Sequence, residues 1–126
     1  MIENIIDIQT RAGAMETFIC HPERHGPFPA VLMLMDAPGI REELYDMARR
    51  LAATGYYVVL PNLYYRAGRD SKFGPGVLTV GDPERDRMRA IRTKMTIPPV
   101  MEDVADMLGF LDHQKQVRPG PVGVHG

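Results

Sequence analysis

The segment from Ala30 to Arg66 constrains the fold more than any other part of the chain. It reads AVLMLMDAPGIREELYDMARRLAATGYYVVLPNLYYR. An apolar run leads through an acidic turn into an amphipathic stretch, then a glycine, a second apolar run, and an aromatic and basic loop. This order predicts a strand–helix–strand unit of an α/β sheet. Its polar residues fall where strands end, which is where open α/β sheets build their sites.

The spacing of apolar residues within this unit supports that interpretation. Residues 30–35 show no polar alternation, which is typical of strands buried on both faces in parallel sheets. Residues 56–60 are rich in strand formers. Over residues 42–54, the apolar positions recur at helical spacing: Leu44, Met47, Ala48 and Leu51. Gly55 then supplies the left-handed residue that ends many helices.

The flanking segments complete the expected sheet. Residues 2–9 and 15–20 predict an antiparallel hairpin with its turn at Ala12-Gly13. Residues 121–124 predict a last strand, which ends in a sharp turn. The expected fold is therefore an antiparallel hairpin that leads into a mostly parallel sheet flanked by helices.

Two further helices are expected between these strands. Asp82-Pro83-Glu84 predicts a helix start, with Asp82 as the capping residue and Pro83 in the first helical position. The second helix follows Pro98-Pro99. Its predicted apolar face consists of Val100, Val104, Met107, Leu108 and Leu111.

Composition limits the classes of function. With 126 residues the chain is one domain or part of one, and 15 basic against 16 acidic residues indicate neither a nucleic-acid nor a membrane partner. The single cysteine, Cys20, cannot form an internal disulfide, and the N-terminus lacks the pattern of a signal peptide. A cytoplasmic protein is expected.

Asp36 and Ala37 are the first candidate site residues. Asp36 directly follows the strand of residues 30–35, where a carboxylate can orient a nucleophile or a base; Asp is also a common turn former or N-cap. The backbone N–H of Ala37 is in the place where α/β-hydrolases supply half of an oxyanion hole. A small residue in a turn is by itself a weak signal.

The remaining candidates are aromatic and basic. Tyr64 and Arg66 follow the second strand of the unit; they fit either a pocket that binds a substrate carboxylate or ordinary packing and solvation. Arg85 and Arg87 belong to a basic cluster whose interleaved acids favour a solvated helix face. The four histidines lack metal-ligand spacing, and no dinucleotide-binding or P-loop motif is present, so neither a metal nor a cofactor is predicted.

Three segments together resemble the N-terminal half of the dienelactone hydrolase family of α/β-hydrolases. They are the turn MDAPG after a buried strand, the block VLPNLYYR, and the closing VGVHG. The resemblance implies hydrolysis of small esters or lactones by a Cys or Ser nucleophile in a G-x-[Cys/Ser]-x-G elbow, with a His base and an Asp. Gly126 matches the first glycine of that elbow, so residues 1–126 would be a partial domain that lacks all three groups and has no turnover alone.

The resemblance also assigns roles to residues that are present. Asp36 falls where the family typically has a Glu beside the nucleophilic thiol, and Ala37 where it has an oxyanion donor. Arg85 or Arg87 falls near an arginine that binds the substrate carboxylate. In the family fold the last strand is central, so an unpaired edge here is expected to be covered by self-association or by a C-terminal complement.

A regulatory domain is the alternative. A receiver-like or flavodoxin-like domain has a suitable length, but a receiver requires an acidic pair after its first strand and a lysine after a later strand. In this sequence no acidic pair follows the first strand, and no lysine follows Val124.

Overall fold

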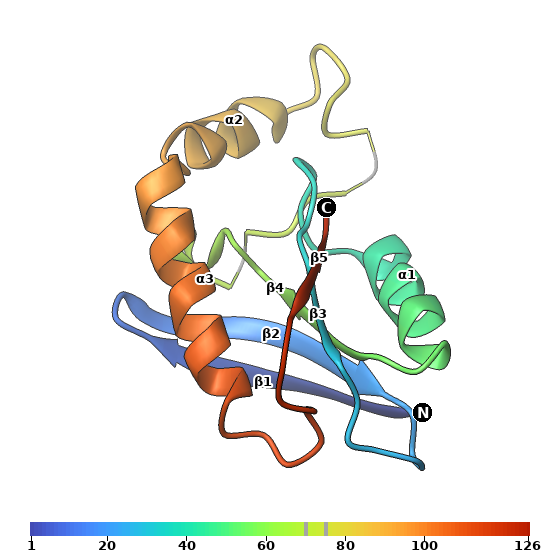
Figure 1. Cartoon of the computed structure of the whole chain (residues 1–126). Coiled ribbons are helices and arrows are strands. Elements are labelled where there is room, and N and C mark those ends of the chain that lie inside the picture. Colours follow the sequence, from blue (N-terminus) through green and yellow to red (C-terminus); the bar gives the residue numbers. More distant parts are fainter. Residues whose placement is uncertain (70, 75) are drawn as a thin grey trace.

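The computed structural model describes residues 1–69, 71–74 and 76–126. Within them the chain forms a five-stranded mixed sheet with helices on both of its faces (Figure 1). The elements are β1 (Ile2–Thr10), β2 (Gly13–His21), β3 (Ala30–Met33), α1 (Glu42–Ala53), β4 (Tyr57–Pro61), the 3₁₀ turn η1 (Tyr65–Ala67), α2 (Arg85–Thr93), α3 (Ile97–Leu111) and β5 (Gly123–His125). The predicted α/β class is confirmed.

The strand order, β1-β2-β4-β3-β5, places the strand–helix–strand unit at the centre of the sheet. β1 pairs antiparallel with β2, and β2 pairs antiparallel with β4. β3 pairs parallel with both β4 and β5, with Val31 opposite Val58 and Leu32 opposite Val124. The expected hairpin leading into parallel strands is therefore confirmed. The carboxyl ends of β3, β4 and β5 meet at one end of the sheet.

Successive residues of a strand point to opposite faces of the sheet, and each face packs against a different helix. On β4, Val59 belongs to a buried apolar cluster with Met107 of α3. Its neighbour Val58 belongs to a second buried cluster with Leu44 and Ala48 of α1. α1 and α3 therefore cover opposite faces.

The hairpin turn lies one residue earlier than predicted. Thr10 pairs with Gly13, so the turn residues are Arg11 and Ala12. The hydroxyl oxygen of Thr10 accepts the N–H groups of Ala12 and Gly13, both at 3.1 Å. This side-chain bonding to the backbone selects the turn position.

The helix limits agree with the sequence at α1 and differ at α2. Gly55, with φ of +111°, follows α1 as expected. The prediction that Asp82 caps α2 is wrong, because α2 begins at Arg85 with Glu84 as its N-cap residue. The Asp82 carboxylate instead accepts the N–H of Glu84 at 2.9 Å, which stabilises a turn ahead of the helix.

The predicted apolar face of α3 is correct at Met107 and Leu111, which are buried, and wrong at Leu108, which is 39% exposed. Asp103 is fully buried on this helix. The buried side of α3 is therefore rotated relative to the prediction, towards Asp103 and away from Leu108.

Beside α3, strand β5 forms an edge of the sheet among the described strands, and its three residues are exposed. Val124 of β5 is 65% exposed. On α3, Ile97 is 78% exposed and Met101 is 56% exposed. A hollow of about 410 Å³ lies between the two elements, lined in part by Leu108 and Val124. We call β5 together with Ile97, Met101 and Leu108 the open α3–β5 surface.

In the described part of the chain, every helix is too short or too polar to cross a bilayer.

Candidate active site

The turn of residues 36–39 follows β3 at the end of the sheet where the parallel strands meet. Its position is fixed by the last pairing to β5, in which the N–H of Leu34 donates to the carbonyl oxygen of His125 at 2.7 Å. Gly126 lies against the side chain of Leu34. The end of β5 and the start of the turn are therefore neighbours, and Figure 1 shows the C-terminus beside the chain that leaves β3.

Asp36 is held by Arg41, which is the N-cap residue of α1. The Arg41 guanidinium contacts both carboxylate oxygens of Asp36, with Nη2 to Oδ2 at 2.9 Å. These hydrogen bonds hold the pKa of the Asp36 carboxyl below its usual value, since they favour the charged form; the partial burial of the group opposes them. About half of the Asp36 side chain is exposed, so the carboxylate remains reachable at the sheet end.

Ala37 has a hydrogen-bonded carbonyl oxygen, and its N–H has no acceptor in the part of the chain that the structure describes. The oxygen accepts the hydroxyl of Tyr64 at 2.6 Å, which is a strong bond between the two sheet-end loops. The hydrogen bonds of the described residues give the Ala37 N–H no acceptor. A free N–H at this place is the donor that an oxyanion hole requires.

Gly39 closes the turn and allows Tyr64 to approach it. Its φ is +82°, and its N–H donates to the carbonyl oxygen of Asp36 at 2.9 Å. A Cβ at this position would lie only 3.2 Å from the Tyr64 ring. Both the backbone conformation and the close ring contact therefore favour glycine here.

Tyr64 is almost fully buried, with its hydroxyl on Ala37 and its ring edge against Phe73. It also lines a cavity of about 370 Å³ between η1 and α2. Arg87 borders the same cavity, whereas Arg85 is partly buried and does not line it. The structure thus brings together two of the three predicted substrate-binding residues.

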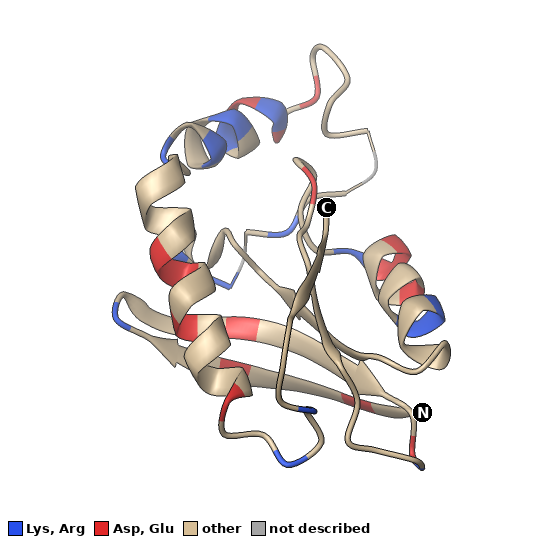
Figure 2. Cartoon of the chain, viewed as in Figure 1, with Lys and Arg blue, Asp and Glu red and all other residues tan. Residues whose placement is uncertain are grey.

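Arg87 has an ion pair and an aromatic contact. Its Nη1 lies 2.7 Å from Oε2 of Glu84, and its guanidinium lies 5.0 Å from the centre of the Phe73 ring. Figure 2 shows basic and acidic residues along the ribbon of α2, in agreement with the solvated-face interpretation. The cavity below Arg87 has apolar walls formed by Leu63, Ile91 and Met95.

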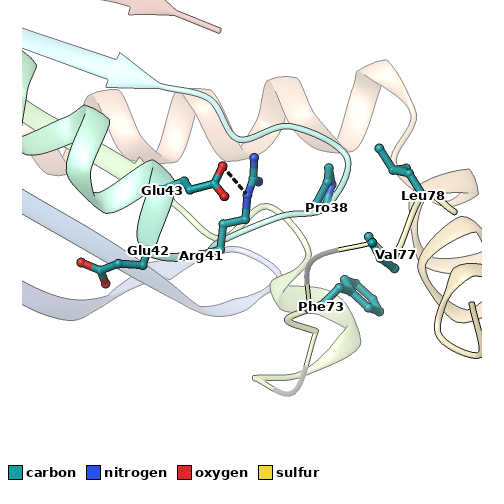
Figure 3. A pocket seen from close by; sticks show the side chains of 9 residues that line it. Pro38, Arg41, Glu42, Glu43, Phe73, Val77 and Leu78 are labelled. Carbon is teal, nitrogen blue, oxygen red and sulfur yellow. Dashed lines mark ion pairs between the residues drawn. The ribbon is translucent and has the colours of Figure 1, made fainter.

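A second cavity, of about 440 Å³, lies on the other side of the turn (Figure 3). Pro38 and Arg41 form its wall at the turn, and Phe73 and Val77 form the wall opposite. Glu43 is 3.6 Å from Nε of Arg41, as the dashed line in Figure 3 marks. Arg41 lines this cavity, whereas Asp36 does not.

Arg66 lines the cavity between η1 and α2, and its guanidinium is paired within the protein. Its guanidinium donates to both oxygens of Asp103, at 2.8 and 3.0 Å, and Tyr65 donates its hydroxyl to the same carboxylate at 2.7 Å. Asp103 is fully buried, and sequence analysis missed it. The available signal was a carboxylate on the apolar stripe of a helix, because Asp103 shares a face with Val100 and Met107.

Cys20 and His21 lie on β2 and are not part of this turn. Burial raises the pKa of the Cys20 thiol to about 11, as expected for a buried apolar residue rather than a nucleophile. His21 stacks on Tyr57 with ring centres 5.2 Å apart. No cluster of three metal-ligating side chains occurs among the described residues.

Comparison with known protein families gives a match over most of the chain. The sequence model of the dienelactone hydrolase family matches residues 15–126. A Yersinia pestis protein with the provisional name carboxymethylenebutenolidase is 36% identical over 62 residues, which are 48% of this chain and 23% of that protein. A protein of the same provisional name from Methylorubrum extorquens is 34% identical over 68 residues, or 54% of this chain and 23% of that protein.

Solved structures share the fold. A Klebsiella pneumoniae protein provisionally named a dienelactone hydrolase superposes with a TM-score of 0.79 at 21% identity, over 98% of this chain and 48% of that one. An esterase from Pyrobaculum calidifontis gives 0.63 at 20% identity, over 98% of this chain and 34% of that one. This chain thus spans about half the length of the Klebsiella protein. All these matches are to hydrolases, so they do not favour a receiver-like or flavodoxin-like domain.

Proposed function

The chain belongs to the dienelactone hydrolase family, and from this we propose that the intact protein hydrolyses small carboxylic esters or lactones. The N–H of Ala37 at the carboxyl end of β3, which has no acceptor among the described residues, carries the proposal. Acyl transfer develops negative charge on the carbonyl oxygen, and an N–H aimed at that oxygen stabilises the transition state. The end of β5 at Gly126 lies next to the same turn, which is where a nucleophile is needed.

Residues 1–126 are, in this proposal, one part of an α/β-hydrolase domain that reaches the start of the nucleophile elbow. A Cys or Ser two residues beyond Gly126 would attack the carbonyl carbon after a His takes its proton. The resulting oxyanion would accept the N–H of Ala37, and collapse of the intermediate would release the alcohol. Water then hydrolyses the acyl-enzyme by the same route.

Asp36 is proposed as a secondary acid that orients the site, because it lies at the sheet end and remains half exposed. Arg87 and Tyr64 are proposed to bind the substrate, since both line the cavity between η1 and α2. Arg85 is the weaker candidate for this role because it does not line that cavity. A Cys or Ser nucleophile with a His base needs no cofactor for this reaction.

We further propose that a C-terminal complement covers the open α3–β5 surface in the intact protein, with a second copy of the chain as the alternative. Exposed apolar residues on β5 and α3 support this, since an unpaired strand edge favours pairing with another chain. A cytoplasmic location is proposed from the single buried, unpaired Cys20, which suits a reducing compartment.

The function is tested by assaying the intact protein with p-nitrophenyl acetate and with a dienelactone. We expect turnover that disappears when the Cys or Ser two residues beyond Gly126 is replaced by Ala. The pure 126-residue chain should show none above a heat-killed control, and adding the remaining segment in trans should restore it. An intact sequence without Cys or Ser at that position, or turnover by the 126-residue chain alone, would contradict the proposal.

A further inference from the structure

The turn of residues 36–39 is held by a side chain that the sequence did not single out. Arg41 bridges the two ends of the turn: its guanidinium binds the Asp36 carboxylate, and Nη1 donates to the carbonyl oxygen of Gly39 at 3.0 Å. Arg41 is only about a quarter exposed. Its backbone begins α1, so its side chain points back over the turn that precedes its own helix.

Tyr64 holds the middle of the turn from another part of the chain. Its hydroxyl binds the carbonyl oxygen of Ala37 at 2.6 Å, and its ring packs against Gly39. The carbonyl oxygens of Asp36, Ala37 and Gly39 thus all accept hydrogen bonds. Pro38 has no N–H and the N–H of Gly39 donates to Asp36, so among the described hydrogen bonds of residues 37–39 only the N–H of Ala37 lacks an acceptor.

We propose that Arg41 is a positioning residue which, together with Tyr64, aims the N–H of Ala37 at the reacting carbonyl oxygen. This inference rests on the proposed hydrolase function. Arg41 lies outside the predicted site, and this positioning role explains its bidentate ion pair with Asp36. The pair orients Asp36 and the turn as one unit, and substrate does not need to contact Arg41.

The planar fork of arginine is what this role requires. One guanidinium reaches the carboxylate and the Gly39 carbonyl at the same time, whereas a lysine ammonium offers a point charge without fixed geometry. Two other charged groups lie nearby, Glu43 beside Arg41 and Arg92 on the α2 side of Tyr64. Substitution of Arg41 by Lys therefore keeps the positive charge but removes the planar set of hydrogen-bond donors. The effects of the charge and of the donor geometry can then be measured separately.

The test uses the intact protein with R41Q, R41K and Y64F, and R50Q as the matched control on the exposed side of α1. We expect kcat to fall about ten-fold in R41Q and Y64F, with KM within about two-fold, because a misplaced donor weakens binding of the transition state alone. R41K should lose kcat like R41Q while keeping the pKa of Asp36 low by NMR titration. R50Q should behave as wild type.

NMR separates failure of this inference from failure of the function. If the intact wild-type protein hydrolyses no ester, the proposed function is wrong, and the Ala37 amide then decides the inference. A shifted Ala37 resonance with faster hydrogen exchange in R41Q and Y64F supports positioning, and unchanged spectra overturn it. In an active protein, unchanged kcat in R41Q, or full kcat in R41K, overturns it as well. If R41Q does not fold, R41K and Y64F carry the test.

Discussion

Helices α1 and α3 both carry apolar stripes, but the sheet covers them to different extents. On α1, Leu44, Ala48 and Ala52 are at most 3% exposed. On α3, Met107 is fully buried, while Leu108 is 39% exposed and Met101 is 56% exposed. The stripe on α3 is therefore wider than the part of the sheet that it meets.

This difference shows what an amphipathic pattern does and does not predict. The spacing of apolar residues identifies a helix and the side that avoids water. It does not identify the partner surface. α1 packs against β2 and β4 in the interior of the sheet, whereas α3 packs against the edge strand β1 and has a hollow between it and β5.

The sharpest comparison is one substitution made on both helices. Leu44→Ala should lower the free energy of unfolding of the 126-residue chain by about 2–5 kcal/mol, because it leaves a cavity in a packed cluster. Leu108→Ala should cost less than about 1 kcal/mol, since that side chain is already partly in water. Urea unfolding monitored by circular dichroism measures both.

Repeating Leu108→Ala in the intact protein shows whether α3 is covered there. A cost that rises to about 2 kcal/mol or more would indicate that Leu108 is buried by the rest of the protein. An equal, small cost in both proteins would contradict the proposal that a C-terminal complement covers the open α3–β5 surface.

The buried carboxylate of α3 gives the second prediction. Asp103→Asn should destabilise the protein by about 2–3 kcal/mol, because it removes the charge that pairs with Arg66 while keeping the side-chain shape. Asp106→Asn on the same helix is the control, since its partner Arg11 is largely exposed and the pair should contribute little. Equal midpoints for the two variants in urea would rule out a stabilising role for the Asp103 network.

Much of the fold was predictable because it depends on local patterns. The unbroken apolar runs identified β3 and β4, and Gly55 correctly marked the end of α1. The start of α2 was not predictable from Asp82 alone, because the Asp82 carboxylate caps a turn instead of the helix. Short polar side chains stabilise both structures, and tertiary packing decides between them.

The candidate site was predictable in position but not in its interactions. The strand end identified Asp36 and Ala37 as neighbours of a site. The bridge by Arg41 and the bond from Tyr64 depend on how α1 and the loop after β4 return to the turn, which residue spacing does not specify. The pairing of Arg66 with Asp103 was missed for the same reason, because the two residues are 37 positions apart in the sequence.

The third prediction concerns association through the open α3–β5 surface. Met101→Lys places a charge in the apolar stripe of α3 and should reduce self-association of the 126-residue chain, with little effect on its stability. Sedimentation velocity across a range of concentrations measures the change. Met47→Lys on α1 is the matched control, because Met47 is similarly exposed (45%) on the other face. If the wild-type chain is monomeric throughout, self-association through this surface is excluded.

The smallest expected effect comes from the Asp36–Arg41 pair of the turn. Its hydrogen bonds lower the pKa of the Asp36 carboxyl below 3.8, so the folded state binds this proton more weakly than the unfolded chain. The pair's contribution to stability is therefore present above about pH 4 and is lost as the pH falls through the lowered pKa. Because Asp36 is half exposed, solvent screening limits this contribution to about 0.5 kcal/mol.

Arg41→Gln should remove this contribution. The variant should be slightly less stable than wild type at pH 6, and the two should converge as the pH falls through the lowered pKa of the Asp36 carboxyl, where the carboxylate gains its proton. Urea unfolding at a series of pH values measures the difference, with Arg50→Gln as the control. A gap between R41Q and wild type that persists unchanged at low pH would show that Arg41 stabilises the turn through its bond to the Gly39 carbonyl and not through the charge of Asp36.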